Sequence, residues 1–189
     1  ISRLSPDPNA DPEAMHLIGT AATAVLAFDL SAAFLKTAVD GLRAQGRLGL
    51  LTQALVSQSW AALHLAIPSL AASAAEEAAR LAPETGQERW GLAAKVALAT
   101  VMGERGELDA AEALAKEAEA VLLPMGTQPM LALVQFARGR GAVAHQRYDD
   151  GYVQLRRVLE PSDVAYHPFV GGWALADLIE AAIHTDRRE

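Results

Sequence analysis

The segment 139-GRGAVAHQRYDDG-151 contains a spacing that recurs along the chain. Gly139 lies nine positions before Tyr148, and Gly151 lies three positions after it. Leucines stand at comparable places earlier, so that the markers recur at nearly even intervals of roughly 38 to 40 positions: Leu30, Leu70, Leu108 and Tyr148. Small residues occupy both offsets each time, in the columns Ala21, Ala61, Ala99 and Gly139, and Ala33, Ser73, Ala111 and Gly151. Two such columns in phase predict helical hairpins that pack closely and stack on one another.

The composition favours helices throughout. Alanine occurs 40 times and leucine 26 times among the 189 residues. Both are strong helix formers because they lose little side-chain freedom in a helix. Hydrophobic residues make up 51% of the chain, enough to bury a core, which argues against intrinsic disorder. We therefore expect no strand and exclude an all-β fold.

Apolar residues at helical spacing, bounded by Gly and Pro, predict nine helices. They cover 11–27, 30–45, 48–67, 69–81, 87–105, 108–123, 129–146, 148–159 and 172–184. Three prolines, at positions 83, 124 and 161, are expected to end second helices. We predict an all-α solenoid of about four hairpins plus a terminal helix, in a single domain over residues 1–189. The repeats are placed at 11–46, 48–86, 87–126 and 127–161, with a half repeat at 170–189.

Two of the hairpin turns resemble tetratricopeptide (TPR) repeats. The resemblance is carried by the segment 139–151 and by 104-ERGELDAA-111. The chain departs from that family in its period, which is about 38–40 against about 34. It also has Ser73 and Gly151 where Ala is usual, and the positions early in a first helix are mostly aliphatic rather than aromatic. The resemblance implies a right-handed TPR-like superhelix.

The segments 76-EEAARLAPETGQ-87 and 173-WALADLIEAA-182 carry a narrower resemblance. Through them, most of the chain resembles the helical middle region of large ATP-binding transcriptional regulators of the LuxR family. Such regulators have an ATPase module before this region and a helix-turn-helix after it. Neither a G-x-x-x-x-G-K-[ST] motif nor a helix-turn-helix is recognisable here. What the resemblance implies is a sensing and relaying role, not ATP hydrolysis or DNA contact.

Charge and residue usage exclude several function classes. The formal net charge of −7 disfavours direct binding of nucleic acid by this segment. No cysteine is present, and the five histidines lack metal-motif spacing, so we expect no cofactor and no metal. Gly139-Arg140-Gly141 is interpreted as a close helix contact rather than a phosphate loop. The sequence offers no catalytic arrangement, and we predict a non-enzymatic protein. No apolar stretch is long enough to span a membrane. The absence of cysteine favours a cytoplasmic location, which we expect for this chain.

Five arginines make the last full repeat locally basic: Arg138, Arg140, Arg147, Arg156 and Arg157. Salt bridges to nearby Asp and Glu are the favoured interpretation, and an anion-binding patch is the alternative. The three tryptophans, at positions 60, 90 and 173, are expected to pack in the core or between repeats.

A stacked array has a concave face lined by its first helices. The repeat phase places Ile18, Gln58, Val96 and Phe136 on this face, followed one turn later by Ala22, Ala62, Thr100 and Arg140. We predict a ligand or partner groove at Gln58, Thr100, Phe136 and Arg140. The alternative is a groove that is merely solvated or covered by a partner.

These observations lead to one functional hypothesis and two competitors. We expect a sensor or scaffold segment of a LuxR-type regulator, which binds an effector small molecule, a protein or a peptide and relays that state to flanking ATPase and DNA-binding modules of the same chain. A homodimer is compatible with this hypothesis. A generic TPR adaptor that grips a partner peptide is the first competitor, and a helical enzyme is the second. Because the chain starts at Ile1 and has no helix-stop residue near Glu189, we expect a segment of a longer polypeptide.

Overall fold

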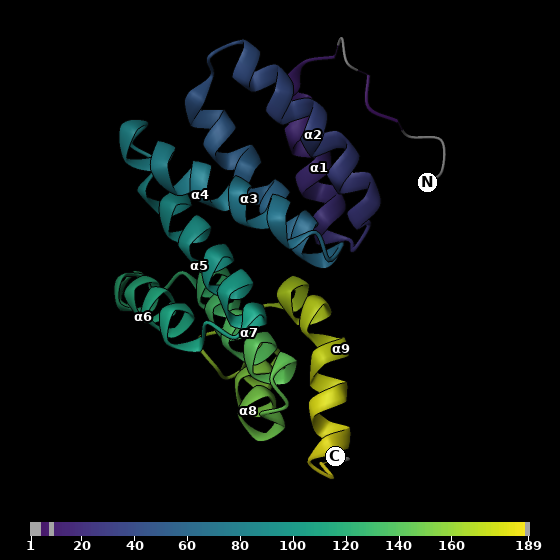
Figure 1. Ribbon diagram of the computed structural model, residues 1–189, viewed down its shortest axis with the longest axis vertical. Helices are drawn as coiled ribbons and strands as arrows, with labels where there is room; N and C mark the ends of the chain where they lie inside the picture. Colours follow the sequence, from purple (N-terminus) through teal and green to yellow (C-terminus); the bar gives the residue numbers. More distant parts are fainter. Residues whose placement is uncertain (1–4, 8–9, 188–189) are drawn as a thin grey trace. The chain divides into compact units, whose positions relative to one another are not determined.

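A computed structural model describes residues 5–7 and 10–187 (Figure 1). That part of the chain contains nine α-helices and no strand, which confirms the all-α prediction. The helices are α1 Pro12–Ala24, α2 Phe28–Ala44, α3 Leu48–His64, α4 Pro68–Glu84, α5 Glu88–Arg105, α6 Leu108–Met125, α7 Gln128–Ala144, α8 Tyr148–Leu159 and α9 Pro168–His184. All nine correspond to predicted helices. The right-handed superhelix stays a prediction.

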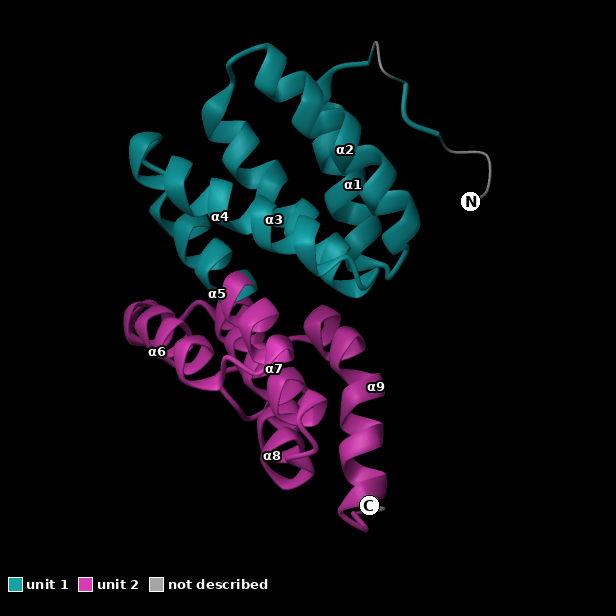
Figure 2. Cartoon of the chain, in the orientation of Figure 1, with its two compact units in different colours: residues 1–97 teal, residues 98–189 magenta. Residues whose placement is uncertain are grey.

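Contacts within the chain divide it into two compact units, residues 1–97 and residues 98–189 (Figure 2). The single-domain prediction spans both. In unit 1, α2 packs against α1 and α3, and α4 packs against α3. In unit 2, α7 packs against α6, α8 and α9. Each unit is therefore built from consecutive helices, as expected for a helical repeat.

The helices begin at a regular interval. From α2 onward their first residues stand at positions 28, 48, 68, 88, 108, 128, 148 and 168. The turn is also repeated: a residue with positive φ stands two positions before seven of these starts, at Leu26, Gly46, Ala66, Gly86, Gly106, Gly126 and Gln146. Glycine adopts this left-handed conformation without a steric penalty. The length of the hairpin repeat is therefore constant from α2 to α9, whereas the sequence markers predicted that it varies slightly.

This regularity corrects the predicted phase of the first two hairpins. Ala33 and Ser73 are exposed rather than packed between helices. Because α2 and α4 begin at positions 28 and 68, about half a helical turn before the markers used in the prediction, the small residues that face the first helices are Ser31 and Ala71. The corrected columns are Gly19, Ser59, Ala99 and Gly139, and Ser31, Ala71, Ala111 and Gly151.

Contacts at these columns explain why the residues are small. A Cβ added to Gly19 would lie 2.7 Å from Leu35 Cγ. The hydroxyl of Ser59 donates a hydrogen bond of 2.8 Å to the carbonyl oxygen of Ala71, which satisfies a polar group in a buried interface. In the last full hairpin, a Cβ on Gly139 would overlap Leu155. In these three hairpins, small residues let the second helix approach the first helix, as the hairpin prediction required.

The prolines do not all act as predicted. Pro83 and Pro124 lie inside the last turns of α4 and α6, and both helices continue for one more residue. Pro161 follows α8, as expected. No helix in the described residues is long and apolar enough to cross a membrane.

Candidate functional site

Helix α7 carries two arginines, Arg138 and Arg140, which are directed to different surroundings in unit 2. Two residues along a helix correspond to a rotation of about 200°, so positions two apart face nearly opposite sides. Arg138 lies in a cavity bounded by α5, α6, α7 and α8, and Arg140 lies beside α5 and α9. The predicted site was placed on the Arg140 side.

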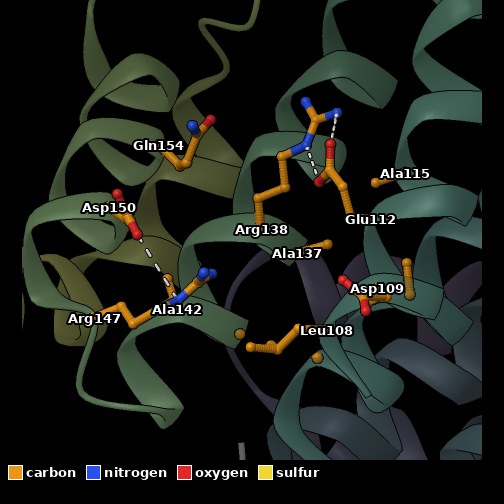
Figure 3. Close-up of a pocket in the computed structure, with 14 residues that line it drawn as sticks. Leu108, Asp109, Glu112, Ala115, Ala137, Arg138, Ala142, Arg147, Asp150 and Gln154 are labelled. Carbon is orange, nitrogen blue, oxygen red and sulfur yellow. Dashed lines mark hydrogen bonds and ion pairs between the residues drawn. The ribbon is translucent and has the colours of Figure 1, made fainter. Parts of the chain in front are cut away.

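The cavity on the Arg138 side has a volume of about 380 Å³ (Figure 3). Its apolar lining consists mainly of small residues: Ala99, Gly103, Ala111, Ala115, Ala137, Gly141 and Ala142. The backbones of α5 and α7 touch here, since a Cβ on Gly141 would lie 3.2 Å from Gly103 Cα. The side chains around this close contact of α5 and α7 are short, so they leave an open space beside it. That space is the cavity.

Arg138 connects α7 to α6 at the edge of this cavity. Its Nε and Nη2 donate to the two carboxylate oxygens of Glu112 at 2.9 and 3.1 Å, and its Nη1 lies 2.8 Å from Glu119 Oε2. Burial opposes the charge of the guanidinium, yet the hydrogen bonds to both glutamates raise the pKa of Arg138. Bidentate pairing fixes the plane of the guanidinium and leaves it little capacity for a ligand.

The remaining polar groups of the cavity are mostly acceptors. Asp109 and Asp150 are exposed at its rim, and Gln154 Oε1 is buried without a hydrogen-bond partner among the described residues. Arg147 is half exposed, with its Nε 3.8 Å from Asp150 Oδ2. A group that supplies hydrogen-bond donors and positive charge therefore matches the cavity better than an anion does.

A cavity of about 520 Å³ occupies the corresponding place in unit 1, between α2, α3 and α4. Gln58 stands at the position that Arg138 holds two hairpins later, and Ile67, Leu70 and Ala74 stand where unit 2 has Arg147, Asp150 and Gln154. These four positions are therefore uncharged in unit 1, where the charged lining residues are Lys36, Asp40, Arg43 and Glu77 instead.

The structure brings together only part of the predicted site. Phe136 and Arg140 are adjacent on α7, with Arg140 Cζ 5.7 Å from the centroid of the Phe136 ring. Arg140 also forms an ion pair with Glu104, and Phe136 meets Trp173 edge-on at 6.2 Å between ring centroids. The Phe136 side chain is fully buried, so it supports Arg140 and Trp173 from beneath and is not open to solvent.

Asp177 on α9 completes this cluster. Burial raises the pKa of the Asp177 carboxyl, with the nearby charges of Glu180 and Glu104 acting in the same direction and the charge of Arg140 opposing it. Arg140, Glu104 and Asp177 therefore form a half-buried cluster of charged side chains, in which Arg140 lies over the ring of Phe136.

Thr100 is fully buried, and Gln58 belongs to unit 1, where it lines the cavity between α2, α3 and α4. The corrected repeat phase also removes Gln58 from the column of Phe136, since the residues one and two hairpins before Phe136 are Val96 and Val56. Sequence reasoning missed Asp109, Glu112 and Gln154, which the strictly regular phase would have placed beside Arg138.

The salt-bridge interpretation of the basic repeat is confirmed for four of its arginines. Arg138, Arg140, Arg147 and Arg157 pair with acidic residues, and Arg157 Nε lies 2.9 Å from Asp163 Oδ2. The glycine interpretation is also confirmed, because Gly139 and Gly141 are both in close helix contacts. Within the described part of the chain, no group of three His, Asp or Glu could hold a metal ion.

No protein-family model, curated protein or solved structure matches the chain.

Proposed function

We propose that this chain is a non-enzymatic sensor or scaffold segment whose unit 2 binds a basic segment of a partner protein in the cavity between α6, α7 and α8. The observation that carries the proposal is the surplus of acceptors around that cavity: the carboxylates of Asp109, Glu112, Glu119 and Asp150 outnumber Arg138 and Arg147, and Gln154 Oε1 is buried without a hydrogen-bond partner among the described residues. Lys and Arg side chains supply several donors each and match such a surface. The net charge of −7 also favours a basic partner over an acidic one.

The same cavity suits a relay role. It is bounded by α5, α6, α7 and α8, so a ligand held there would contact more than one hairpin. A ligand that prefers one arrangement of these helices would shift the population toward it, because each repeat contacts mainly its neighbours. We place this activity in the cytoplasm and, following the resemblance, within a LuxR-type regulator.

A peptide titration tests the binding proposal. The probes are two short fluorescein-labelled peptides of alternating Ala and Lys or alternating Ala and Glu, followed by fluorescence anisotropy at low and high salt. We expect the lysine peptide alone to bind, with affinity that falls at high salt. Asp109→Asn combined with Asp150→Asn should weaken binding about tenfold. The matched control is Asp29→Asn combined with Glu76→Gln, which removes the same charge from two exposed acids of unit 1 that do not line its cavity. Equal binding of both peptides, or none at millimolar concentration, would refute the proposal.

The wider assignment has its own test, which is the sequence that flanks this chain. An upstream P-loop motif and a downstream helix-turn-helix would support the regulator. If both are absent, the generic TPR adaptor is favoured. The adaptor would bind its peptide in the same cavity of unit 2.

A further inference from the structure

The C-terminal helix α9 exposes a continuous apolar stripe. Leu175, Ile179 and Ile183 follow one another at intervals of four residues and are 47%, 56% and 69% exposed. Residues at this interval lie on one face of a helix. Ile179 and Ile183 also line a hollow of about 310 Å³ together with Ala182 and Arg187.

The residues equivalent to Ile179 and Ile183 are covered in every earlier hairpin. The residues that correspond to Ile179 are Gly19, Ser59, Ala99 and Gly139, and those that correspond to Ile183 are Thr23, Leu63, Gly103 and Val143. All eight are buried. In the hairpin of α7 and α8, a Cβ on Gly151 of α8 would lie 2.6 Å from Val143 Cγ2. The second helix of the hairpin is what covers this stripe.

Helix α9 occupies the place of a first helix. Tyr148 at the start of α8 stacks on His184 at the end of α9, with ring centroids 4.0 Å apart and planes 8° from parallel. Phe28 at the start of α2 stacks in the same way on His64 at the end of α3, at 4.1 Å and 12°. Both residues of the first pair stand three hairpins after their counterparts in the second, so α9 follows α8 as α3 follows α2.

The chain after α9 then makes the turn that precedes a second helix. Asp186 has a φ of 55°, and the N–H of Arg187 donates a 3.0 Å hydrogen bond to the carbonyl oxygen of Ala182. After α3, Ala66 has the same φ and Ile67 bonds to Ala62 at 2.9 Å, and α4 begins at the next residue. Arg187 is held by Asp149 at 2.9 Å and by the ring of Tyr152, with Cζ 4.6 Å from its centroid.

From the repeated turn and the uncovered stripe, we propose that α9 is the first helix of a fifth hairpin, and that the Leu175–Ile179–Ile183 stripe is the docking surface for a second helix supplied by the same polypeptide after Arg187. Ile179 replaces the small residue of the other hairpins. The docking helix must therefore carry a small residue opposite Ile179, where α8 carries Leu155 opposite Gly139.

The test compares two proteins. The first is the chain of residues 1–189, and the second continues along the same reading frame through one further helix and the turn after it, at the helix spacing of the earlier hairpins. Ile179→Asp is introduced into both. Val153→Asp is the matched control, because Val153 is an exposed apolar residue of α8 whose counterparts Ala33, Ser73 and Ala113 are also exposed. The readouts are thermal melting, backbone hydrogen exchange of α9 and molar mass in solution.

In the extended chain we expect the amides of α9 to exchange at least tenfold more slowly than in the shorter one. Ile179→Asp should lower the Tm of the extended chain by about 5 °C or more and leave the shorter chain nearly unchanged. Val153→Asp should have little effect in either. Equal exchange of α9 in both chains, or a reading frame that stops at residue 189, would overturn the proposal. A dimer of the extended chain that Ile179→Asp dissociates would also overturn it, because a second copy would then cover the stripe.

Discussion

Gly103 and Gly141 bring the backbones of α5 and α7 into direct contact, since a Cβ on Gly103 would lie 3.3 Å from Gly141 Cα. The atom in the way is backbone, which cannot turn aside as a flexible side chain can. This contact forms part of the floor of the unit 2 cavity.

Gly141→Val should destabilise the protein by about 2 kcal/mol, because the added methyl groups force two close-packed helices apart. Urea denaturation followed by circular dichroism measures the change. Gly49→Val is the control: a Cβ there meets only Gln87 Nε2, at 3.6 Å. A Gly141→Val protein as stable as the Gly49→Val protein would contradict the contact.

The Arg138 ion pairs should contribute measurably to stability. Arg138→Met leaves Glu112 and Glu119 without their shared partner and should cost about 1–2 kcal/mol, a moderate value because both carboxylates are partly exposed. A double-mutant cycle with Glu112→Gln isolates the pair. Additive single effects would show that the pair contributes nothing. Lys36→Met, at a solvent-exposed pair on α2, should have a smaller effect.

His16 should make unit 1 sensitive to acid. Burial lowers the pKa of His16 from its ordinary value of 6.5, against a partial opposing effect of Glu13, and neither ring nitrogen has a hydrogen-bond partner among the described residues. The unfolded state therefore takes up a proton first as the pH falls. Stability conferred by neutral His16 is complete above the ordinary pKa and declines as the pH drops toward the lowered value.

His16→Leu should remove this decline. We expect the variant to lose less stability than the parent between pH 7.5 and pH 5.5, as measured by urea denaturation at both values. Parallel losses in the two proteins would assign the acid sensitivity to other groups.

The repeated turn predicts a stabilising substitution. Ala66 adopts a φ of 55°, which costs a residue with a Cβ about 1 kcal/mol and costs glycine little. Ala66→Gly should therefore raise stability slightly, despite the greater freedom of glycine in the unfolded chain. The control is Ala113→Gly on the exposed face of α6, which should cost about 1 kcal/mol. Thermal melting of both variants should give shifts of opposite sign.

Much of the secondary structure could be predicted because its signals are local. Helix-forming residues between Gly and Pro placed all nine helices, and the glycine positions 46, 86, 106 and 126 marked the turns that the structure has. The turns at Leu26, Ala66 and Gln146 lack this signal, since none of these residues favours positive φ. The start of α8 was still predicted at Tyr148, whereas the starts of α2 and α4 were predicted late, and the columns of the first two hairpins shifted with them.

The error in the repeat phase also affected the choice of residues for the predicted groove. Each residue turns a helix by about 100°, so an error of two positions moves a side chain to the other side of its helix. Gln58 was thereby grouped with Phe136, although its counterpart is Arg138. The pairing of Phe136 with Arg140 was predicted correctly, because it depends only on positions four apart in one helix.

Composition, helix propensity and turn chemistry, all carried by short stretches of residues, established an all-α chain of successive helices with small residues at their contacts. Packing between helices determined which small residues meet, which acids pair with the arginines, and which side chains line the cavity of each unit. These features depend on residues such as Arg138 and Glu112, 26 positions apart, whose distance is set only when the helices pack.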